Sequence, residues 1–460
     1  ENMSADYSEL FVPTRVRKAV ISLVIPTLMS QLIAVLYNMA DTFFIGQIGD
    51  PNQVAAVSLC MPMFMFLTGL ANLFGIGGAS LMARSLGLHD HDRAKRTAAF
   101  SIWTATGISL FYGLALYVLR GVLLPAVGAD QYTYQFCEQY IFWTITIGAV
   151  PTVLNQALAH LVRSEGYSKQ ASFGMALGGV LNMILDPIFI FPLGLEVAGA
   201  AIATMLSNLI AMLYFLLLIR HRGSSTNVVL HPKYYTLRQR IPQEVLLVGL
   251  PSCAMNLMGV ASNITLNRLL VSYANTAVAG IGVAKKVDML TFAIINGMSQ
   301  GALPLISYNF SSKNFSRMMA AIKTTFLYSI VVTSICAVLL FTCAAPIVRA
   351  FIDDAETVQY GQLFQRIICI TGPIVSVTMI SITIFQSVGK KLEPLILSLL
   401  RKGGLDIPLM FLMDHLAGIE GIVWATPIAD CCAMVVSIAL FLPFWRHLSQ
   451  VLHPADLPTL

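Results

Sequence analysis

The chain has 460 residues, of which 57% are hydrophobic and only 11% are charged, and its mean hydropathy is +0.75. This composition excludes an ordinary soluble domain, in which about 25% of the residues are charged. The formal net charge of +5 comes from Lys and Arg spread over separate polar segments, so it provides no basic face for nucleic acid.

Apolar stretches long enough to cross a membrane recur along the whole chain. Crossing a hydrocarbon core of ~30 Å takes about 20 residues of helix, and helix is expected because a lipid-exposed backbone must satisfy its own hydrogen bonds. The stretches are 18–46, 54–84, 97–122, 134–161, 170–192, 198–220, 244–273, 277–308, 318–346, 361–387, 393–414 and 418–445. We therefore predict an all-α integral membrane protein with twelve transmembrane helices.

The second half of the chain repeats the first. The matching residues are Pro26 and Pro251, Gly77 and Gly301, Asp186 and Asp406, and Thr204 and Thr426. Each half has an even number of spans, so both halves begin and end on the same side of the membrane. We expect two six-helix bundles related by a pseudo-two-fold axis along the membrane normal, an arrangement typical of transporters.

The distribution of charge predicts the orientation and the domain boundaries. Lys and Arg concentrate near the termini, in the central linker and in alternate loops, whereas the opposite loops are acidic. Positive charge marks the cytoplasmic side, so both termini are predicted to be cytoplasmic. The predicted parts are an N-terminal tail (1–17), a first bundle (18–220), a cytoplasmic linker (221–242), a second bundle (243–446) and a C-terminal tail (447–460). The polar linker is long enough to let the bundles move independently.

Catalytic and cofactor motifs do not emerge from the sequence. The eight cysteines lie mostly inside apolar stretches, where Cys acts as a small hydrophobe. A GxxxxGK[ST] phosphate loop does not occur, and the glycines of GIGGAS at 75–80 indicate close helix packing. No cleavable signal peptide is expected, because the first apolar run is a full span. We therefore predict a protein that is not an enzyme and carries no cofactor.

Four polar residues within predicted spans indicate an ion site. Asp41 lies in NMADTFFIG, and Asp186 lies in LNMILDPIFI one helical turn after Asn182. Thr204 follows the small-residue run AGAAIA, which would let its helix approach a neighbour closely. An Asp at the centre of a membrane helix costs roughly 2.5–3.5 kcal/mol on insertion scales, so its presence requires a reason. Two carboxylates, an amide and a hydroxyl would suit Na⁺, and two close carboxylates would also accept a proton readily.

Other roles for these residues stay open. Asp41 could cap a helix end near the membrane surface, and Asn182 could form a hydrogen bond between helices. Asp186 precedes Pro187 and could be a polar group near a loop. The ion site is favoured because independent surface roles would not explain why all four residues occur together.

The motifs NMADTFFIGQIG, LNMILDPIFIF and GAAIAT resemble those of the multidrug and toxic compound extrusion (MATE) family, and the resemblance extends from about residue 15 to 447. It implies a plasma-membrane antiporter that exports cationic, amphipathic compounds in exchange for Na⁺ or H⁺ by alternating access. It also implies that Asp41, Asn182, Asp186 and Thr204 form the cation site. By the same resemblance Pro26 would be a hinge, and Tyr37, Tyr140 and Asn155 would lie near the substrate cavity.

The second half departs from the first at the site. Leu266 or Asn267 stands opposite Asp41. The stretches PSCAMNLMGVASN of the seventh span and ITGPIVSVTMISITIFQ of the tenth contain no carboxylate, which places the coupling ion in the first bundle. Cations and acids of the second bundle lie within three to five residues of each other, so local pairing is expected. These residues are Lys285, Lys286, Asp288, Arg401, Lys402 and Asp406. Asp288 and Asp430 could instead face the cleft and attract a cationic substrate.

Two other classes of function remain open at this point. A flippase for lipid-linked precursors shares the two-bundle architecture but should have a strongly cationic cavity. A channel or receptor would not need a duplicated, ion-binding first bundle. We expect a monomer that contacts lipid and small cationic molecules, and the sequence does not choose between Na⁺ and H⁺.

Overall fold

The computed structural model describes residues 15–452, and every regular element in this range is a helix. These residues divide into two compact units, Met29–Leu257 and the remainder, 15–28 with 258–452. The chain passes between the units inside two continuous helices, α2 (Val16–Gln47) and α10 (Ile241–Val271). Each of these helices therefore contributes to both units.

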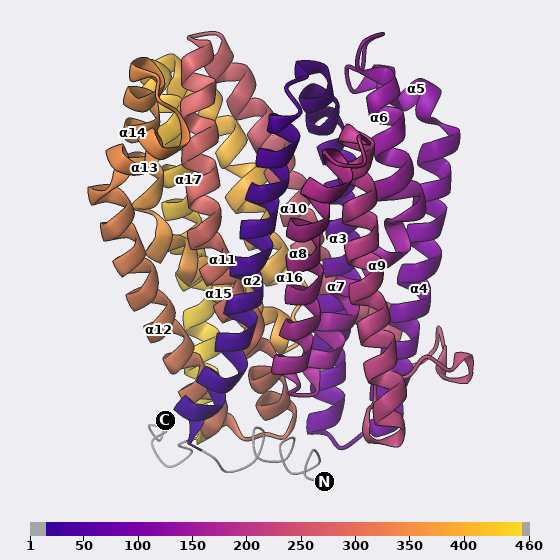
Figure 1. Ribbon diagram of the computed structural model, residues 1–460. Coiled ribbons are helices and arrows are strands. Elements are labelled where there is room, and N and C mark those ends of the chain that lie inside the picture. Colours follow the sequence, from indigo (N-terminus) through magenta and orange to yellow (C-terminus); the bar gives the residue numbers. More distant parts are fainter. Residues whose placement is uncertain (1–14, 453–460) are drawn as a thin grey trace. The chain divides into compact units, whose positions relative to one another are not determined.

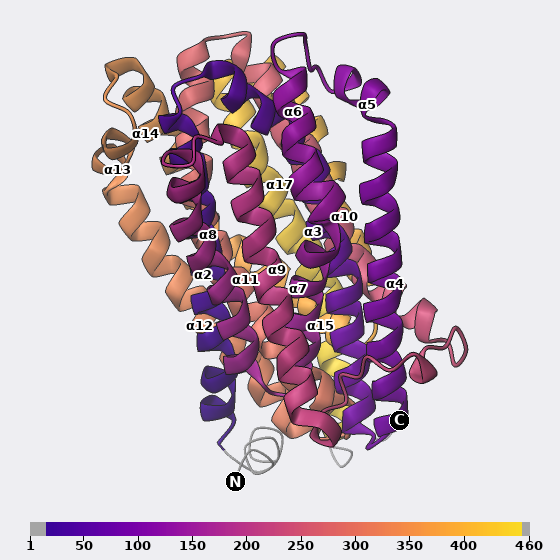
Figure 2. The same ribbon diagram turned by 45° about the vertical axis from the view of Figure 1, so that its right-hand side comes forward.

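Long helices that run side by side form the first unit (Figures 1 and 2). Besides its parts of α2 and α10, it contains α3 (Pro51–Gly87), α4 (His91–Val118), α5 (Arg120–Ala126), α6 (Tyr134–Ile141), the π-helical turn η1 (Phe142–Ile147), α7 (Ala149–Ser164), α8 (Ser168–Ile190), α9 (Glu196–Arg222), and the short turns η2 (Gly223–Ser225) and η3 (Pro232–Tyr234). α7 packs against α3, α4, α8 and α9, so it is the central helix of this unit. Phe74, Phe100 and Phe215 are buried in its core.

The second unit is built in the same way. It contains α11 (Asn275–Ser311), α12 (Phe315–Thr342), α13 (Ala344–Phe351), α14 (Ala355–Cys369), α15 (Gly372–Ser387), α16 (Leu392–Leu399), the π-helical turn η4 (Leu400–Gly404) and α17 (Asp406–Leu452). Gly418 interrupts α17 with a φ of 67°, a conformation that glycine adopts without steric cost, and so divides α17 into two arms. Leu270, Ile281, Phe364 and Ile422 are buried in the core of this unit.

Matched glycines explain why α2 and α10 are shared. In the first unit, a Cβ atom on Gly77 of α3 would collide with the carbonyl oxygen of Val245 in α10. In the second unit, a Cβ atom on Gly301 of α11 would lie 2.8 Å from the Cα atom of Val24 in α2. Only glycine allows such close backbone approach. The repeated glycine thus fixes the same contact twice, each time against the beginning of the other half's first helix.

The twelve predicted stretches are helical, but fewer of the helices qualify as membrane spans by length and composition. By length and composition, eight helices could cross a membrane, and ten if each bent pair counts as one span. The bent pairs are Tyr134–Ile147 with Ala149–Ser164 (48°) and Ala355–Cys369 with Gly372–Ser387 (46°). Both arms of α17 fall within one candidate membrane span, Leu392–Leu452. α11 is not among the ten candidate spans, and it carries the charged residues Lys285, Lys286 and Asp288. Each predicted stretch coincides with helix in the structure.

The units differ from the predicted domains at their edges. Residues 18–28 belong with the second unit and residues 243–257 with the first, because of the exchanged starts of α2 and α10. The linker 221–242 packs on the first unit beside α4 (Figures 1 and 2). Trp103 Nε1 donates a hydrogen bond to the Leu230 carbonyl at 2.9 Å, and the hydroxyls of Thr104 and Tyr235 lie 3.2 Å apart. The linker is therefore held to one unit along part of its length.

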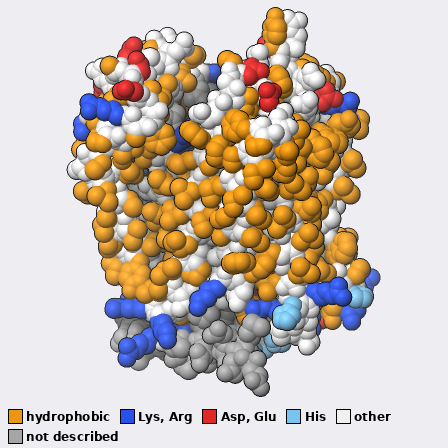
Figure 3. All heavy atoms as spheres, in the orientation of Figure 1, with side chains coloured by type: hydrophobic (Ala, Val, Ile, Leu, Met, Phe, Trp, Pro, Cys, Tyr) orange, Lys and Arg blue, Asp and Glu red, His pale blue; other side chains and the backbone are white. Residues whose placement is uncertain are grey.

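Charge is distributed unevenly along each unit. Hydrophobic side chains cover the middle of the visible face, most visible Lys and Arg lie toward one end, and the visible Asp and Glu lie toward the other (Figure 3). This pattern fits the one used above to predict orientation. The predicted tails lie largely outside the described residues, and the cytoplasmic location of the termini stays a prediction.

Candidate functional site

Asp41 of α2 and Asp186 of α8 meet inside the first unit. Their carboxyl groups lie within hydrogen-bonding distance of each other. Asp186 is completely buried, and Asp41 lies inside α2, away from either helix end. The structure thus brings together the two acids on which the sequence-based hypothesis depends.

Gly179 lies where α8 packs closely against α2. A Cβ atom at Gly179 of α8 would lie 3.0 Å from Cγ2 of Ile33 and 3.2 Å from Cδ1 of Tyr37, both in α2. A methyl group there would require Ile33 and Tyr37 to shift by a few tenths of an ångström, and a large side chain would not fit between α2 and α8 without moving them apart. Asp186 follows two helical turns later and faces the same neighbouring helix.

One oxygen of Asp41 lacks a protein partner. Its Oδ1 atom is buried, and none of the residues 15–452 forms a hydrogen bond with it. A buried polar atom left in this state costs about 1–3 kcal/mol, so native structures rarely retain one without a reason. A bound cation or a proton on this oxygen would remove the cost.

Asn182 and Thr204 lie on the neighbouring helices α8 and α9. Asn182 Nδ2 donates a hydrogen bond to Thr204 Oγ1 at 3.3 Å, and both side chains are buried. Ala200, Ala201 and Ala203 are buried beside Thr204, which is the close packing expected from the small-residue run. The hydrogen bond between helices that was an alternative role for Asn182 is therefore present, and the Asn182 Oδ1 atom belongs to the same polar group.

Two tyrosines border the acidic pair. Tyr37 of α2 and Tyr140 of α6 both lie close enough to interact electrostatically with Asp41 and Asp186. Tyr140 is almost completely buried. Both tyrosines, predicted to lie near the cavity, are thus neighbours of the predicted cation site.

The remaining predicted residues lie in other surroundings. Asn155 of α7 donates to Asn208 Oδ1 at 3.0 Å, and Asn208 donates to Thr152 at 3.0 Å, which forms a polar ladder between α7 and α9. Pro26 lies inside α2, shortly before the point at which this helix passes from the second unit to the first. Asp288 belongs to the second unit, where its charged neighbours are Lys285, Arg401, Lys402 and Asp430.

Local pairing holds for only one of the basic side chains of η4. Lys402 Nζ lies 3.9 Å from Asp406 Oδ2, as local pairing predicted. Arg401, in contrast, pairs through Nε with Asp430 Oδ1 at 3.1 Å, across to the second arm of α17. Its local assignment was wrong, because adjacent residues of a helix point in different directions and only one of the two side chains can face Asp406.

Sequence reasoning also missed buried charges near the end of α7. Arg163, expected in a loop, is 1% exposed inside α7, and its Nη1 atom lies 3.5 Å from His160 Nδ1. Glu165 is equally buried and accepts hydrogen bonds from Thr226 Oγ1 (2.7 Å) and the Asn227 backbone N–H (2.5 Å). Burial raises the pKa of Glu165, which these hydrogen bonds oppose. Its position just before the Gly166 turn gave no sequence signal of burial.

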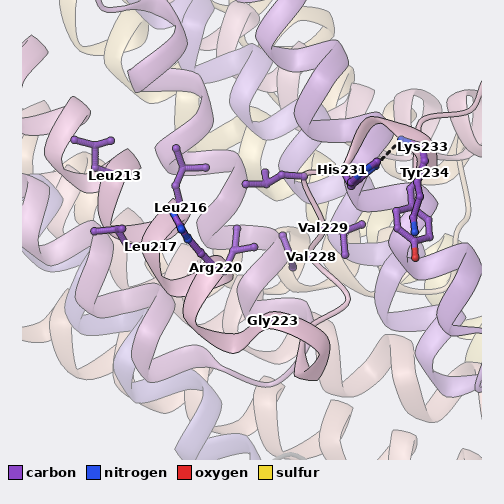
Figure 4. A pocket seen from close by; sticks show the side chains of 12 residues that line it. Leu213, Leu216, Leu217, Arg220, Gly223, Val228, Val229, His231, Lys233 and Tyr234 are labelled. Carbon is purple, nitrogen blue, oxygen red and sulfur yellow. Dashed lines mark hydrogen bonds between the residues drawn. The ribbon is translucent and has the colours of Figure 1, made fainter.

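A pocket of about 530 Å³ lies elsewhere in the first unit, where α9 meets the linker (Figure 4). Leu213, Leu216 and Leu217 form its apolar wall, and Arg220, His231 and Lys233 supply polar groups. It contains none of the predicted site residues. Among the described residues, no group of three or more His, Cys, Asp or Glu could hold a metal ion. The acidic pair with its amide and hydroxyl is therefore the candidate site.

The chain matches a protein-family model and has sequence relatives among known proteins. The MatE family model matches residues 26–188 and again residues 251–412, once in each half of the repeat. The multidrug export protein MepA of Staphylococcus saprophyticus is 30% identical over 433 residues, which cover 94% of this chain and 95% of that protein. MepA of Staphylococcus aureus is 28% identical over the same coverage.

Solved structures show the same fold. A crystal structure of MATE in complex with MaL6 has a TM-score of 0.91 and 23% identity, covering 97% of this chain and 99% of that one. A multidrug resistance MATE family transporter of the MOP superfamily, in an outward-facing conformation, has a TM-score of 0.88 and 24% identity, with 98% and 100% covered.

Proposed function

The chain belongs to the MatE family and is a multi-pass membrane transporter, and from this premise we propose that it exports cationic, amphipathic compounds in exchange for a cation held by Asp41 and Asp186. The multidrug export proteins to which it is similar support this substrate class. We place the transporter in the cell membrane as a monomer with both termini in the cytoplasm.

The contact between the two carboxyl groups carries the proposal. Two carboxylates this close repel each other, and burial removes the water that would screen them. The pair is stable only with a positive charge or a shared proton between its oxygens. A transporter that must bind an ion in one state and release it in another requires a site of this kind.

The neighbouring polar groups suit a small cation. The buried Oδ1 atom of Asp41, the carboxylate of Asp186, the Asn182 amide oxygen and the Thr204 hydroxyl are all oxygen ligands, which hard cations prefer. The same pair of acids accepts a proton without any of the other ligands. Na⁺ and H⁺ are both compatible with this arrangement, and the experiment below separates them.

Pro26 provides a weak point in α2 for the conformational step. Proline has no N–H to donate to the carbonyl of Ser22, so one hydrogen bond of the helix is missing there. The next residue, Thr27, donates its hydroxyl to the Leu23 carbonyl at 2.9 Å, a bond that tends to bend helices. We propose that α2 bends here when the cation binds, which moves Asp41 and Tyr37 and expels the substrate.

Alternating access follows from these parts. In the outward-open state the cation binds at the acidic pair and the substrate leaves. In the inward-open state the cation is released and a new substrate enters. The substrate and the coupling cation carry the same sign of charge, so they compete for the same negative region and are exchanged rather than moved together.

Transport into proteoliposomes tests the proposal. Ethidium movement is measured with an imposed Na⁺ gradient, an imposed proton gradient, or neither. One of the two gradients should drive ethidium against its concentration, and the Asp41→Asn variant should lose this coupling. Thr106→Val in α4, whose hydroxyl bonds only to its own helix at Ile102 in the described residues, serves as a matched control and should transport normally. Wild-type transport by Asp41→Asn would remove the proposed coupling role.

A further inference from the structure

The second unit contains a counterpart of the proposed cation site. The sequence repeat places Asp406 opposite Asp186 and Thr426 opposite Thr204, and the family model matches both halves. Asn182 lies four residues before Asp186, and Lys402 lies four residues before Asp406. The amide of the first site is thus replaced by an ammonium group in the second.

The counterpart is assembled in space as well as in sequence. Asp406 is completely buried and accepts a hydrogen bond from Thr426 Oγ1 at 2.9 Å through Oδ1. The hydroxyl of Ser262, in α10, donates to the other carboxylate oxygen of Asp406. Ser262 is as far beyond Pro251 as Tyr37 is beyond Pro26, so the first helix of each half supplies a hydroxyl-bearing residue beside the aspartate. The structure therefore reproduces the three-helix arrangement.

In the second unit, a lysine side chain supplies the positive charge beside the buried aspartate. Lys402 Nζ lies 3.9 Å from Asp406 Oδ2, which already accepts a hydrogen bond from Ser262. An ammonium group is a compact charge that seeks several oxygen ligands, much as a small metal cation does. In the first unit, by contrast, the charged neighbour that acts on Asp186 is another acid, Asp41.

The surrounding charges are balanced in the same way. Arg401 Nε pairs with Asp430 Oδ1 at 3.1 Å, with both side chains nearly buried, and Lys285 lies near Asp288. Three bases and three acids therefore share this region: Lys285, Arg401, Lys402, Asp288, Asp406 and Asp430. A buried carboxylate with a fixed counter-charge needs no exchangeable ion.

The backbone holds Lys402 in position. It lies in the π-helical turn η4, and a Cβ atom on the next residue, Gly403, would lie 2.6 Å from the sulfur of Met258 in α10. η4 therefore packs closely on the Met258 side chain of the helix that carries Ser262. π-Helical turns often occur at functional sites.

We propose that the ammonium group of Lys402 is a tethered cation that occupies the second unit's copy of the ion site and closes it to ion exchange. Removing this group leaves buried oxygen ligands from Asp406, Thr426 and Ser262 that bind Na⁺. The comparison between the two sites rests on the function proposed for the first one. The Na⁺ site that forms when the Lys402 ammonium group is removed is predicted from the geometry of the second unit alone.

The test creates the vacant site in a protein whose first site is disabled. The background is Asp41→Asn with Asp186→Asn, and Lys402→Asn restores the residue found at position 182. Thermal unfolding is followed as NaCl replaces choline chloride at alkaline pH, where protons compete less for Asp406. We expect a saturable rise in Tm of at least about 2 °C for Lys402→Asn once Na⁺ reaches about 100 times its Kd. The background alone should show no such rise.

Matched variants identify the cause of the response. Lys285→Asn removes another lysine of the same region, and Lys402→Arg keeps the positive charge, so neither should respond to Na⁺. Adding Asp406→Asn to Lys402→Asn should abolish the response. A folded Lys402→Asn protein without a Na⁺ response, or an equal response in Lys285→Asn, would overturn the proposal.

A reciprocal variant covers the case in which Lys402→Asn does not fold. Asn182→Lys places an ammonium group one turn before Asp186, and it should remove the ion dependence of stability that the wild type shows. Retention of that dependence would also overturn the proposal. If the wild type and the Asp41→Asn, Asp186→Asn background respond equally to ions, the function proposed for the first site fails, whereas the tethered cation is judged by the Lys402 variants.

Discussion

The carboxyl groups of Asp41 and Asp186 lie within hydrogen-bonding distance of each other, although they come from α2 and α8, which are far apart in the chain. Tyr37 and Tyr140 lie beside both acids. Asp186 is completely buried, as is the Oδ1 atom of Asp41, and like charges in such a place lower the stability of the fold unless a cation or a proton neutralises them. The contact is therefore a place where function is favoured over stability.

Neutralising one acid should separate these two effects. Asp186→Asn removes the repulsion within the pair, so its Tm in the absence of added ions should equal or exceed that of the wild type. Coupled export should fall by at least about tenfold, because the cation loses a charged ligand. Thermal unfolding and ethidium efflux by cells expressing each variant measure the two effects. A variant that unfolds several degrees earlier would show that the pair stabilises the fold.

Gly179 should tolerate no large side chain. In Gly179→Leu the new side chain meets Ile33 and Tyr37 of α2, so α2 must move away from α8 at the level of the site. We expect a loss of about 1–3 kcal/mol from overpacking, together with loss of export. Thermal unfolding and ethidium efflux check both results.

Gly107 provides the control for this substitution. It lies in α4, and a Cβ atom there would meet nothing within 4 Å. Gly107→Leu should keep or slightly raise the stability, since leucine favours helix more than glycine does. Equal damage from both substitutions would show that the contact between α2 and α8 is not special.

Glu165 should make stability depend on pH. Burial raises its pKa above the ordinary value of 4.5, so the folded state binds its proton more tightly than the unfolded state does. The resulting stability is fully present below about pH 4.5 and is lost as the pH rises through the folded-state pKa. Glu165→Gln cannot ionise, so its Tm should fall less over this range than that of the wild type.

Asp354 provides a control of opposite sign. Its side chain accepts hydrogen bonds from the Thr357 backbone N–H and hydroxyl, and these lower its pKa below 3.8. Its contribution is therefore present above about pH 3.8 and is lost as the pH falls. Asp354→Asn should flatten the acidic limb of the Tm profile. A Glu165→Gln profile parallel to that of the wild type would contradict the assignment for Glu165.

Removing one member of the Arg401–Asp430 ion pair should lower the free energy of unfolding more than replacing both members with apolar residues. Asp430→Asn leaves the buried guanidinium group without its charged partner, and such changes typically cost about 3–5 kcal/mol. The double variant Arg401→Met with Asp430→Leu removes both charges and should recover most of this loss. Thermal unfolding of the single and double variants measures the coupling. Equal losses in all of them would mean that the pair contributes by packing alone.

The sequence predicted the helices well, because membrane spans are long, apolar and repeated. All twelve predicted stretches are helical, and the small residues before Thr204 pack as expected. The matched Gly77 and Gly301 were visible as a repeat, but their partners were not. The sequence gives no signal that each glycine faces the first helix of the other half, so the exchanged starts of α2 and α10 required the structure.

The candidate site was only partly predictable. Asp41 and Asp186 could be selected because a charge inside a membrane helix is expensive. The close packing of α8 on α2 at Gly179, which accompanies their contact, gave no such signal in the sequence. Arg163 was expected in a loop because of its charge, whereas it is buried inside α7 close to the equally buried Glu165. Arg401 was assigned to a local acid by its spacing alone, but adjacent residues of a helix point in different directions, and Lys402 is the one that faces Asp406.

The most direct test of the account measures whether the acidic pair couples ion flow to drug flow. Purified protein is reconstituted into liposomes, and the flux of the coupling ion is recorded while an ethidium gradient is imposed. In the wild type, ethidium should drive Na⁺ or H⁺ in the opposite direction, and this flux should be absent in both Asp41→Asn and Asp186→Asn. Ethidium-driven ion flux of wild-type size in either variant would contradict it.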